Sequence, residues 1–196
     1  MKKLAIMTVL LTVLSFTVCA QGLYFDIGLG FGKAWTKVDG EDFSDSFKST
    51  GVDLDELGID LGLKLGYGPF GRIPLYIAAE LSGVGHRFYD SSDYIQFNSY
   101  LIGGGIIFYP IRLIQIAGSF GYSFVSNDSS LGLSMYDSKG GFAGNVSVAL
   151  DIGRNNHGLL IGAKFTGTSN TLEVSDVKMN TYMIGLFVKY AYRHKV

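Results

Sequence analysis

Segments of about ten residues in which apolar residues alternate with small or polar ones recur along most of this chain. In the clearest, 57–66, leucine and isoleucine occupy every odd position, while glycine, Asp60 and Lys64 occupy the even ones. A repeat of two residues is typical of a β-strand with one apolar face, because successive side chains point to opposite faces. The pattern predicts about eight strands. They are expected over 23–35, 57–66, 74–83, 95–109, 114–124, 142–152, 159–166 and 182–193.

Connections between these segments alternate between long and short. The short ones, 68–72, 110–112 and 153–157, are rich in turn-forming residues. The long ones are 36–56, 84–94, 126–139 and 168–179. An up-and-down barrel in an outer membrane has this arrangement, because its loops and its turns fall on opposite sides of the bilayer. We therefore predict an all-β fold, an eight-stranded antiparallel up-and-down transmembrane β-barrel with long extracellular loops and short periplasmic turns.

The fourth segment, 95–109, contains Gly103, Gly104 and Gly105 and has apolar residues at both odd and even positions. Periodicity therefore does not assign its two faces. It is predicted as a strand from its context and from its flanking aromatic residues.

The first twenty residues have the pattern of an export signal. Lys2 and Lys3 precede an apolar stretch over 4–18, and small residues at 18–20 suit a cleavage site. We predict a cleaved signal peptide over 1–20 and a barrel domain over 21–196. Beyond the signal, no apolar run approaches the roughly 18 residues of a membrane-spanning helix, so a membrane location requires a closed sheet. Removing both lysines changes the net charge from −1 to −3, which gives no reason to expect nucleic-acid binding.

Periodicity alone does not say which face of each strand points inward. In a soluble barrel of the lipocalin type the apolar face would line the cavity. Here the other face carries mostly glycine, alanine and serine with a few charges, which suits a narrow lumen. An eight-stranded barrel is just wide enough to be filled by side chains, and buried charges need partners. We therefore predict a lumen charge network, with a polar conduit for protons or small solutes as the alternative. Its residues are Asp26, Asp60, Lys64, Glu80, Asp151, Lys164, Lys189 and Arg193.

Aromatic residues cluster at both ends of the strands, as expected for the girdles that flank the apolar band of a membrane barrel. The alternative is that aromatic residues favour strands in general. The predicted girdle comprises Phe25, Trp35, Tyr67, Tyr76, Phe108, Phe124, Phe142, Phe165, Tyr182, Tyr190 and Tyr192, and Phe88, Phe97 and Tyr109 mark the same levels.

In signal, strand pattern, loop asymmetry and last strand, the chain resembles the small eight-stranded outer-membrane barrels, the group of OmpX, OmpW and the transmembrane domain of OmpA. Their terminal assembly motif has a polar residue, a glycine and two hydrophobic or aromatic residues. Met183, Gly185, Val188 and Tyr190 occupy that spacing, so the polar position is not matched, and the chain continues to Val196. The resemblance implies an outer-membrane location and contact with outer-membrane lipid and lipopolysaccharide-type glycolipid.

Candidate catalytic groups are scarce. Some similar barrels modify lipid A with a histidine, a serine and an acid. Here the only conceivable set is His86 with Ser82 and Glu80, and an isolated histidine in the loop 84–94 is expected to be solvated. The glycines at 28, 30 and 32 lack the spacing of a phosphate-binding loop. Acidic residues crowd the loop 36–56, which favours a hydrated surface over a calcium or magnesium site. We predict no catalytic residue, cofactor or metal.

These observations predict a non-enzymatic, monomeric barrel with a filled lumen and a structural or surface-interaction role, in which the long loops contact a host or other surface partner. One alternative is an OmpW-like channel for small apolar solutes. A further alternative is a lipid A-modifying enzyme.

Overall fold

The structure is a computed structural model that describes residues 20–48, 54–70, 73–90, 93–130, 137–173 and 176–193. Eight long strands dominate it: β1 (Ala20–Val38), β3 (Asp55–Phe70), β4 (Leu75–Asp90), β5 (Asp93–Ile111), β6 (Ile114–Ser129), β7 (Ser138–Asp151), β8 (His157–Leu172) and β9 (Lys178–Arg193). A two-residue strand, β2 (Glu41–Asp42), and a short helix, α2 (Phe43–Lys48), follow β1. Within the described ranges, no helix has the length and apolar character needed to cross a membrane.

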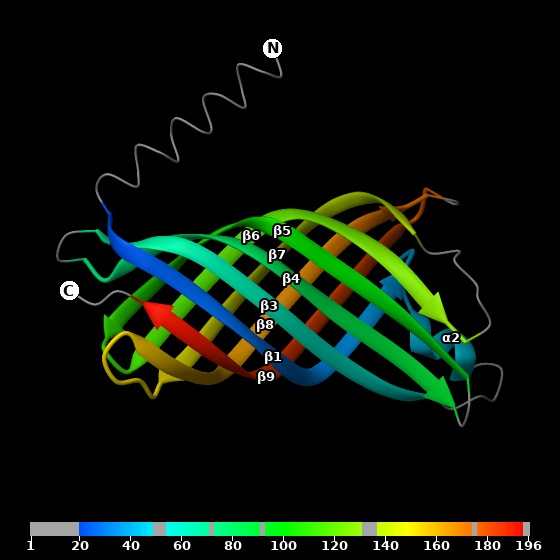
Figure 1. The fold of residues 1–196 in the computed structure, drawn as a ribbon. Coiled ribbons are helices and arrows are strands. Elements are labelled where there is room, and N and C mark those ends of the chain that lie inside the picture. Colours follow the sequence, from blue (N-terminus) through cyan, green and yellow to red (C-terminus); the bar gives the residue numbers. More distant parts are fainter. Residues whose placement is uncertain are drawn as a thin grey trace, which may run out of the picture.

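The long strands form one closed barrel. Each pairs antiparallel with the next in sequence, and β1 also pairs with β9, so no long strand is left as an open edge. The start of β1 and the end of β9 lie at one end of the barrel, and α2 lies at the other (Figure 1). We call these the turn end and the loop end. The predicted fold class, an eight-stranded antiparallel up-and-down barrel, is confirmed.

The strands are staggered around the barrel. A row of paired residues that starts at Ile27 and passes once through all eight strands returns to β1 at Lys37, ten residues further along. With strands about 4.8 Å apart and about 3.3 Å per residue, this stagger corresponds to a tilt of about 40°. The lumen of such a barrel has room for side chains and little else.

The apolar face of the strands is the outer wall. Leu61, Val148 and Leu186 are 59%, 54% and 72% exposed, whereas Lys64 and Asp151 are 2% and 1% exposed. A water-soluble barrel would have the opposite arrangement, with leucines inside and charges outside. The exposed wall is therefore suited to lipid, and the lipocalin-like alternative is excluded.

The apolar wall has the height of an outer-membrane hydrocarbon layer. On β9 the outward side chains from Tyr182 to Tyr192 are all apolar or aromatic. Ten residues at about 3.3 Å each, tilted by about 40°, span about 25 Å. This equals the usual height of the apolar band in such barrels.

Strands extend further at the loop end than we predicted. Most of the predicted loop 84–94 is strand: β4 continues to Asp90 and β5 begins at Asp93. The predicted loops 36–56, 126–139 and 168–179 are shortened in the same way. The hydrogen-bonded ladder continues past the apolar band, where the outer wall no longer needs apolar side chains. By contrast, the predicted signal peptide 1–20 lies outside the described residues apart from Ala20, and its cleavage stays a prediction.

The structure assigns the faces of β5, which periodicity left open. Leu101 and Ile107 point into the lumen and are almost fully buried, while Ile102 and Ile106 are exposed on the outer wall. Apolar residues occupy both phases because this strand contributes to the lumen packing as well as to the lipid-facing wall.

Candidate functional site

The lumen contains all eight charged residues that the sequence assigned to it. Each is buried, and each acid lies beside at least one base. Four pairs result: Asp26 with Lys189, Asp60 with Lys164, Lys64 with Glu80, and Asp151 with Arg193. Burying a charge without a partner is costly, so this pairing is the condition under which a polar lumen is stable.

Glu80 is the centre of the network. Its carboxylate lies 2.9 Å from the Lys64 ammonium and 3.8 Å from that of Lys164, and it accepts a hydrogen bond of 3.0 Å from the Asn145 amide. Lys164 also donates to Asp60 at 2.7 Å, which links β3, β4, β7 and β8 across the lumen. The Lys64 ammonium donates in addition to the Ser119 hydroxyl on β6, at 3.0 Å. The middle of the barrel is therefore cross-braced by side chains.

Tyrosines close the lumen at the turn end. Tyr24, Tyr76 and Tyr109 are packed against one another, with ring centroids 5.3 Å apart for the first two and 6.0 Å for the last two. The Gln115 amide donates to the hydroxyls of Tyr24 and Tyr109 at 2.9 and 2.7 Å. The Tyr24 hydroxyl in turn donates to Asp26 at 2.7 Å, which ties this cluster to the Asp26–Lys189 pair.

Arg193 completes the closure at the turn end. Its guanidinium contacts the Asp151 carboxylate and lies 4.7 Å from the centre of the Tyr109 ring. Both partners are buried, so the last described residue of β9 lies inside the barrel rather than in water.

An apolar cap closes the lumen at the loop end. Phe43, the first residue of α2, packs against Phe97 and Phe88 with ring centroids 4.8 and 5.1 Å apart. Val125, Leu172 and Met179 complete this cluster. The lumen therefore has an aromatic closure at each end and an ionic network between them.

Phe88, Phe97 and Tyr76 were predicted on the girdle and are instead inside the barrel, as is Tyr109. Tyr76 lies close to the start of β4, where a girdle residue is expected, but an even number of residues separates it from Glu80. Its side chain therefore points into the lumen, as that of Glu80 does. The outer wall carries the other ten predicted girdle residues: Phe25, Trp35, Tyr67, Phe108, Phe124, Phe142, Phe165, Tyr182, Tyr190 and Tyr192.

His86 is not the solvated loop residue that we expected. It lies on the inward face of β4 and is fully buried, with its ring centre 4.1 Å from that of Phe88. Its Nδ1 lies 2.9 Å from the Thr36 hydroxyl and its Nε2 lies 3.4 Å from Glu56. Ser82 and Glu80, the partners that the sequence suggested, share its face of β4, but Glu80 is bound to Lys64.

Thr36, His86 and Glu56 bring a hydroxyl, an imidazole and a carboxylate together, the groups that nucleophilic catalysis uses, but His86 Nε2 makes no hydrogen bond within the part of the chain that the structure describes. Catalysis also needs access for a substrate. Thr36 and His86 have no exposed surface and lie beneath the apolar cap around Phe43. In this conformation a substrate has no access to the Thr36 hydroxyl or to the His86 ring.

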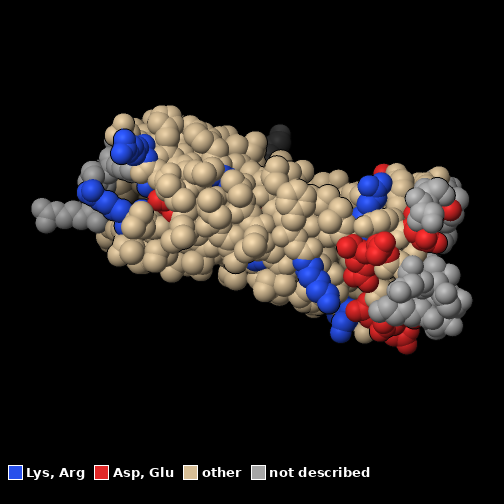
Figure 2. Space-filling view, turned by 90° about the horizontal axis from the view of Figure 1, so that it is seen from below, with Lys and Arg blue, Asp and Glu red and all other residues tan. Residues whose placement is uncertain are grey.

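Acidic residues gather at the loop end. Apart from the four lumen acids, every Asp and Glu within the described ranges lies in β2, in α2, or close to the strand ends there. Figure 2 shows them at one end of the molecule, beyond a wall that is almost free of charge. No three His, Cys, Asp or Glu side chains of the described part of the chain are grouped so that they could hold a metal ion.

Sequence reasoning missed Tyr24, Gln115 and Asn145 as members of the lumen network. Each lies in the inward phase of its strand, between charged or small residues. That phase was readable from the sequence, but their hydrogen-bond partners lie on strands far away in the chain.

No protein-family model and no curated protein sequence matches the chain. Solved structures do. Ail, the attachment invasion locus protein of Yersinia pestis, is 18% identical and superposes with a TM-score of 0.52 over 85% of this chain and 97% of Ail. Ail in complex with the heparin analogue sucrose octasulfate, also 18% identical, gives 0.51 over 86% and 99%. Neisserial surface protein A is 16% identical, with 0.50 over 86% and 97%. The chain thus has the fold of the small eight-stranded outer-membrane β-barrels.

Proposed function

We propose that this protein is a non-enzymatic outer-membrane barrel that is closed to diffusion and acts through its loop end. The observation that carries the proposal is the filled lumen. Paired charges occupy its middle, tyrosines and Arg193 occupy the turn end, and the cap around Phe43 occupies the loop end. What remains for contact with other molecules is the outer wall and the loop end.

The charge of the loop end favours a basic partner. Ail, which has the same fold, was solved with a sulfated heparin analogue. The loop end of the present chain is rich in acids, which repel sulfated or phosphorylated polymers. We therefore propose a positively charged surface, or one bridged through divalent cations, as the partner of this end.

A closed lumen predicts that the protein does not conduct ions. The folded protein inserted into a planar lipid bilayer is expected to give no stable single-channel steps, because paired side chains fill the middle of the lumen and a side-chain cluster closes each end. Insertion is checked by the change in gel mobility between boiled and unboiled samples. Stable steps of uniform size would contradict the proposal and favour the channel alternative.

The contact chain of Thr36, His86 and Glu56 is the one observation that favours an enzyme of lipid A. We expect the lipid A of cells that produce the protein to have the same mass spectrum as that of cells without it. A changed acylation pattern that disappears with His86→Ala, while the variant still folds by gel mobility, would replace our proposal with the enzymatic one.

A further inference from the structure

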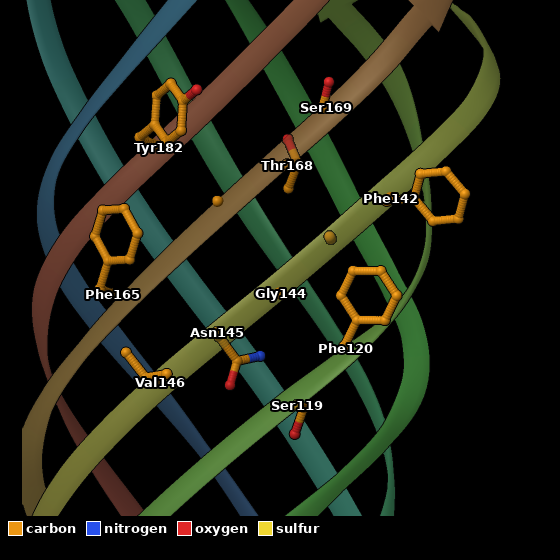
Figure 3. A pocket seen from close by; sticks show the side chains of 12 residues that line it. Ser119, Phe120, Phe142, Gly144, Asn145, Val146, Phe165, Thr168, Ser169 and Tyr182 are labelled. Carbon is orange, nitrogen blue, oxygen red and sulfur yellow. The ribbon is translucent and has the colours of Figure 1, made fainter.

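The outer wall contains a groove that crosses β6, β7, β8 and β9. It lies in the half of the apolar band nearer the loop end. Its volume is about 460 Å³. Two stacked ring pairs form its sides: Phe120 with Phe142, 5.8 Å apart, and Phe165 with Tyr182, 6.4 Å apart. Figure 3 shows Gly144 between these two pairs.

Two outward glycines form the floor of the groove. Gly144 on β7 is paired directly with Gly167 on β8, so two neighbouring strands lack a side chain at the same place. Neither glycine is required by crowding. A Cβ at Gly167 would be in ordinary contact with the Tyr182 ring at 3.4 Å, and one at Gly144 would lie 3.3 Å from the Ser119 carbonyl oxygen, which a shift of a few tenths of an ångström relieves. A larger residue therefore needs only a small adjustment of the wall at Gly144 and none at Gly167.

The groove leads toward a basic site. The paired row that contains Gly144 and Gly167 continues to Tyr182 on β9 and then to Trp35 on β1. At about 4.8 Å per strand, Gly167 lies about 10 Å from Trp35 along the wall.

Lysines lie on both sides of Trp35. Lys33 and Lys37 are exposed on the same outward face of β1. Neither has an ion-pair partner in the part of the chain that the structure describes. Trp35 itself lies at the upper limit of the apolar band and packs 6.3 Å from Tyr182. Cations and a tryptophan at this level are typical of a membrane interface, where lipid phosphates lie.

We propose that this wall binds one phosphate-bearing lipid of the surrounding leaflet. An acyl chain lies in the groove over Gly144 and Gly167, and the phosphate contacts Lys33 and Lys37 beside Trp35. The charge complementarity selects an anionic lipid over a zwitterionic one, and the groove holds the chain in a fixed place. The site is independent of the lumen and of the loop-end partner.

The single tryptophan of the chain provides the readout. The folded full-length protein is placed in phosphatidylcholine vesicles that contain a small fraction of one brominated lipid, because brominated acyl chains quench tryptophan fluorescence. The brominated lipid is phosphatidylglycerol in one sample and phosphatidylcholine in the other, at the same fraction. Each lysine near a membrane surface strengthens anionic lipid binding roughly five-fold. The brominated phosphatidylglycerol is therefore expected to bind at least five-fold better than the brominated phosphatidylcholine, measured from the quenching of Trp35.

Two double variants separate the parts of the site. Lys33→Gln with Lys37→Gln is expected to remove the preference for phosphatidylglycerol. Gly144→Leu with Gly167→Leu keeps both lysines but fills the groove, and is expected to lower the quenching of Trp35 by the brominated phosphatidylglycerol at least two-fold. The matched control is Gly104→Leu, since Gly104 is an outward glycine of β5 with the nearest atom to its Cβ at 3.8 Å and no part in this groove.

The preference is expected to be unchanged in the Gly104→Leu control. Equal quenching of the unmodified protein by both lipids would overturn the proposal. Quenching by the brominated phosphatidylglycerol that is unchanged when Gly144 and Gly167 are filled would overturn the groove as the binding site and indicate attraction by surface charge alone. Each variant is first shown to fold by its gel mobility.

Discussion

A Lys64→Met variant is expected to lose about 3–5 kcal/mol of unfolding free energy, the usual cost of leaving one partner of a buried ion pair alone. Lys64 is 2% exposed and its ammonium is 2.9 Å from Glu80. Without it, Glu80 keeps the Asn145 hydrogen bond, but the only cation left beside it among the described residues is Lys164 at 3.8 Å, which is already bound to Asp60. The measurement is a urea titration of the protein in lipid vesicles, with the folded fraction read from gel mobility.

The control is a double variant in which Glu80 is also replaced, Lys64→Met with Glu80→Leu. It removes one acid and one base together, and Lys164 still pairs with Asp60 at 2.7 Å. Replacing a whole buried ion pair by apolar residues of similar size is often neutral. The double variant is therefore expected to recover most of the stability lost by Lys64→Met. A double variant as unstable as the sum of both single variants would mean that the two residues act independently, contrary to the network.

The alternation of apolar residues predicted the barrel correctly because lipid imposes it. Within the apolar band every outward position of β3 needs an apolar or small side chain, and the inward ones need small or paired polar side chains. Leu61 and Lys64, assigned to opposite faces from the sequence, lie on opposite faces. The rule is local, so it needs no knowledge of which strands are neighbours.

The same rule failed at the loop end because the surroundings change there. In β4, Ile77 and Leu81 point outward, but further along Val84 and Phe88 point inward. Above the bilayer the outer wall meets water and the lumen becomes the apolar core, as in a soluble barrel. The apolar phase therefore switches from odd to even positions within one strand. This switch resembles the end of a strand, which is why His86 was predicted in a loop.

The partners within the lumen could not be predicted from the sequence. The phase of each strand indicated which charges point inward, and balance between four acids and four bases indicated that they pair. Which acid meets which base depends on the stagger of ten residues around the barrel. Lys164 and Asp60 lie 104 positions apart in the chain and on strands that are not neighbours. Only the closed barrel brings them to 2.7 Å.

Substituting leucine at two adjacent glycines of β5 is expected to give opposite results. Gly103 points inward, where a Cβ would lie 2.3 Å from the Phe120 carbonyl oxygen and 2.7 Å from the Gly121 Cα. Real Cβ atoms do not approach backbone so closely, so β5 and β6 would have to separate. Gly104 points outward with no atom within 3.8 Å of its Cβ. We expect Gly103→Leu to cost more than the 1–3 kcal/mol of ordinary overpacking, and Gly104→Leu to change stability by no more than about 0.5 kcal/mol.

Both variants are refolded from urea into lipid vesicles, and the folded fraction is read from gel mobility. Gly103→Leu should remain largely at the unfolded position under conditions in which Gly104→Leu and the unmodified protein fold completely. The two substitutions add the same side chain at neighbouring positions. A difference between them therefore tests which of the two residues points into the lumen and how closely β6 approaches β5 there. If Gly103→Leu folded as well as Gly104→Leu, the tight contact between Gly103 and Gly121 would be wrong, and with it the narrow lumen on which the closed-barrel proposal rests.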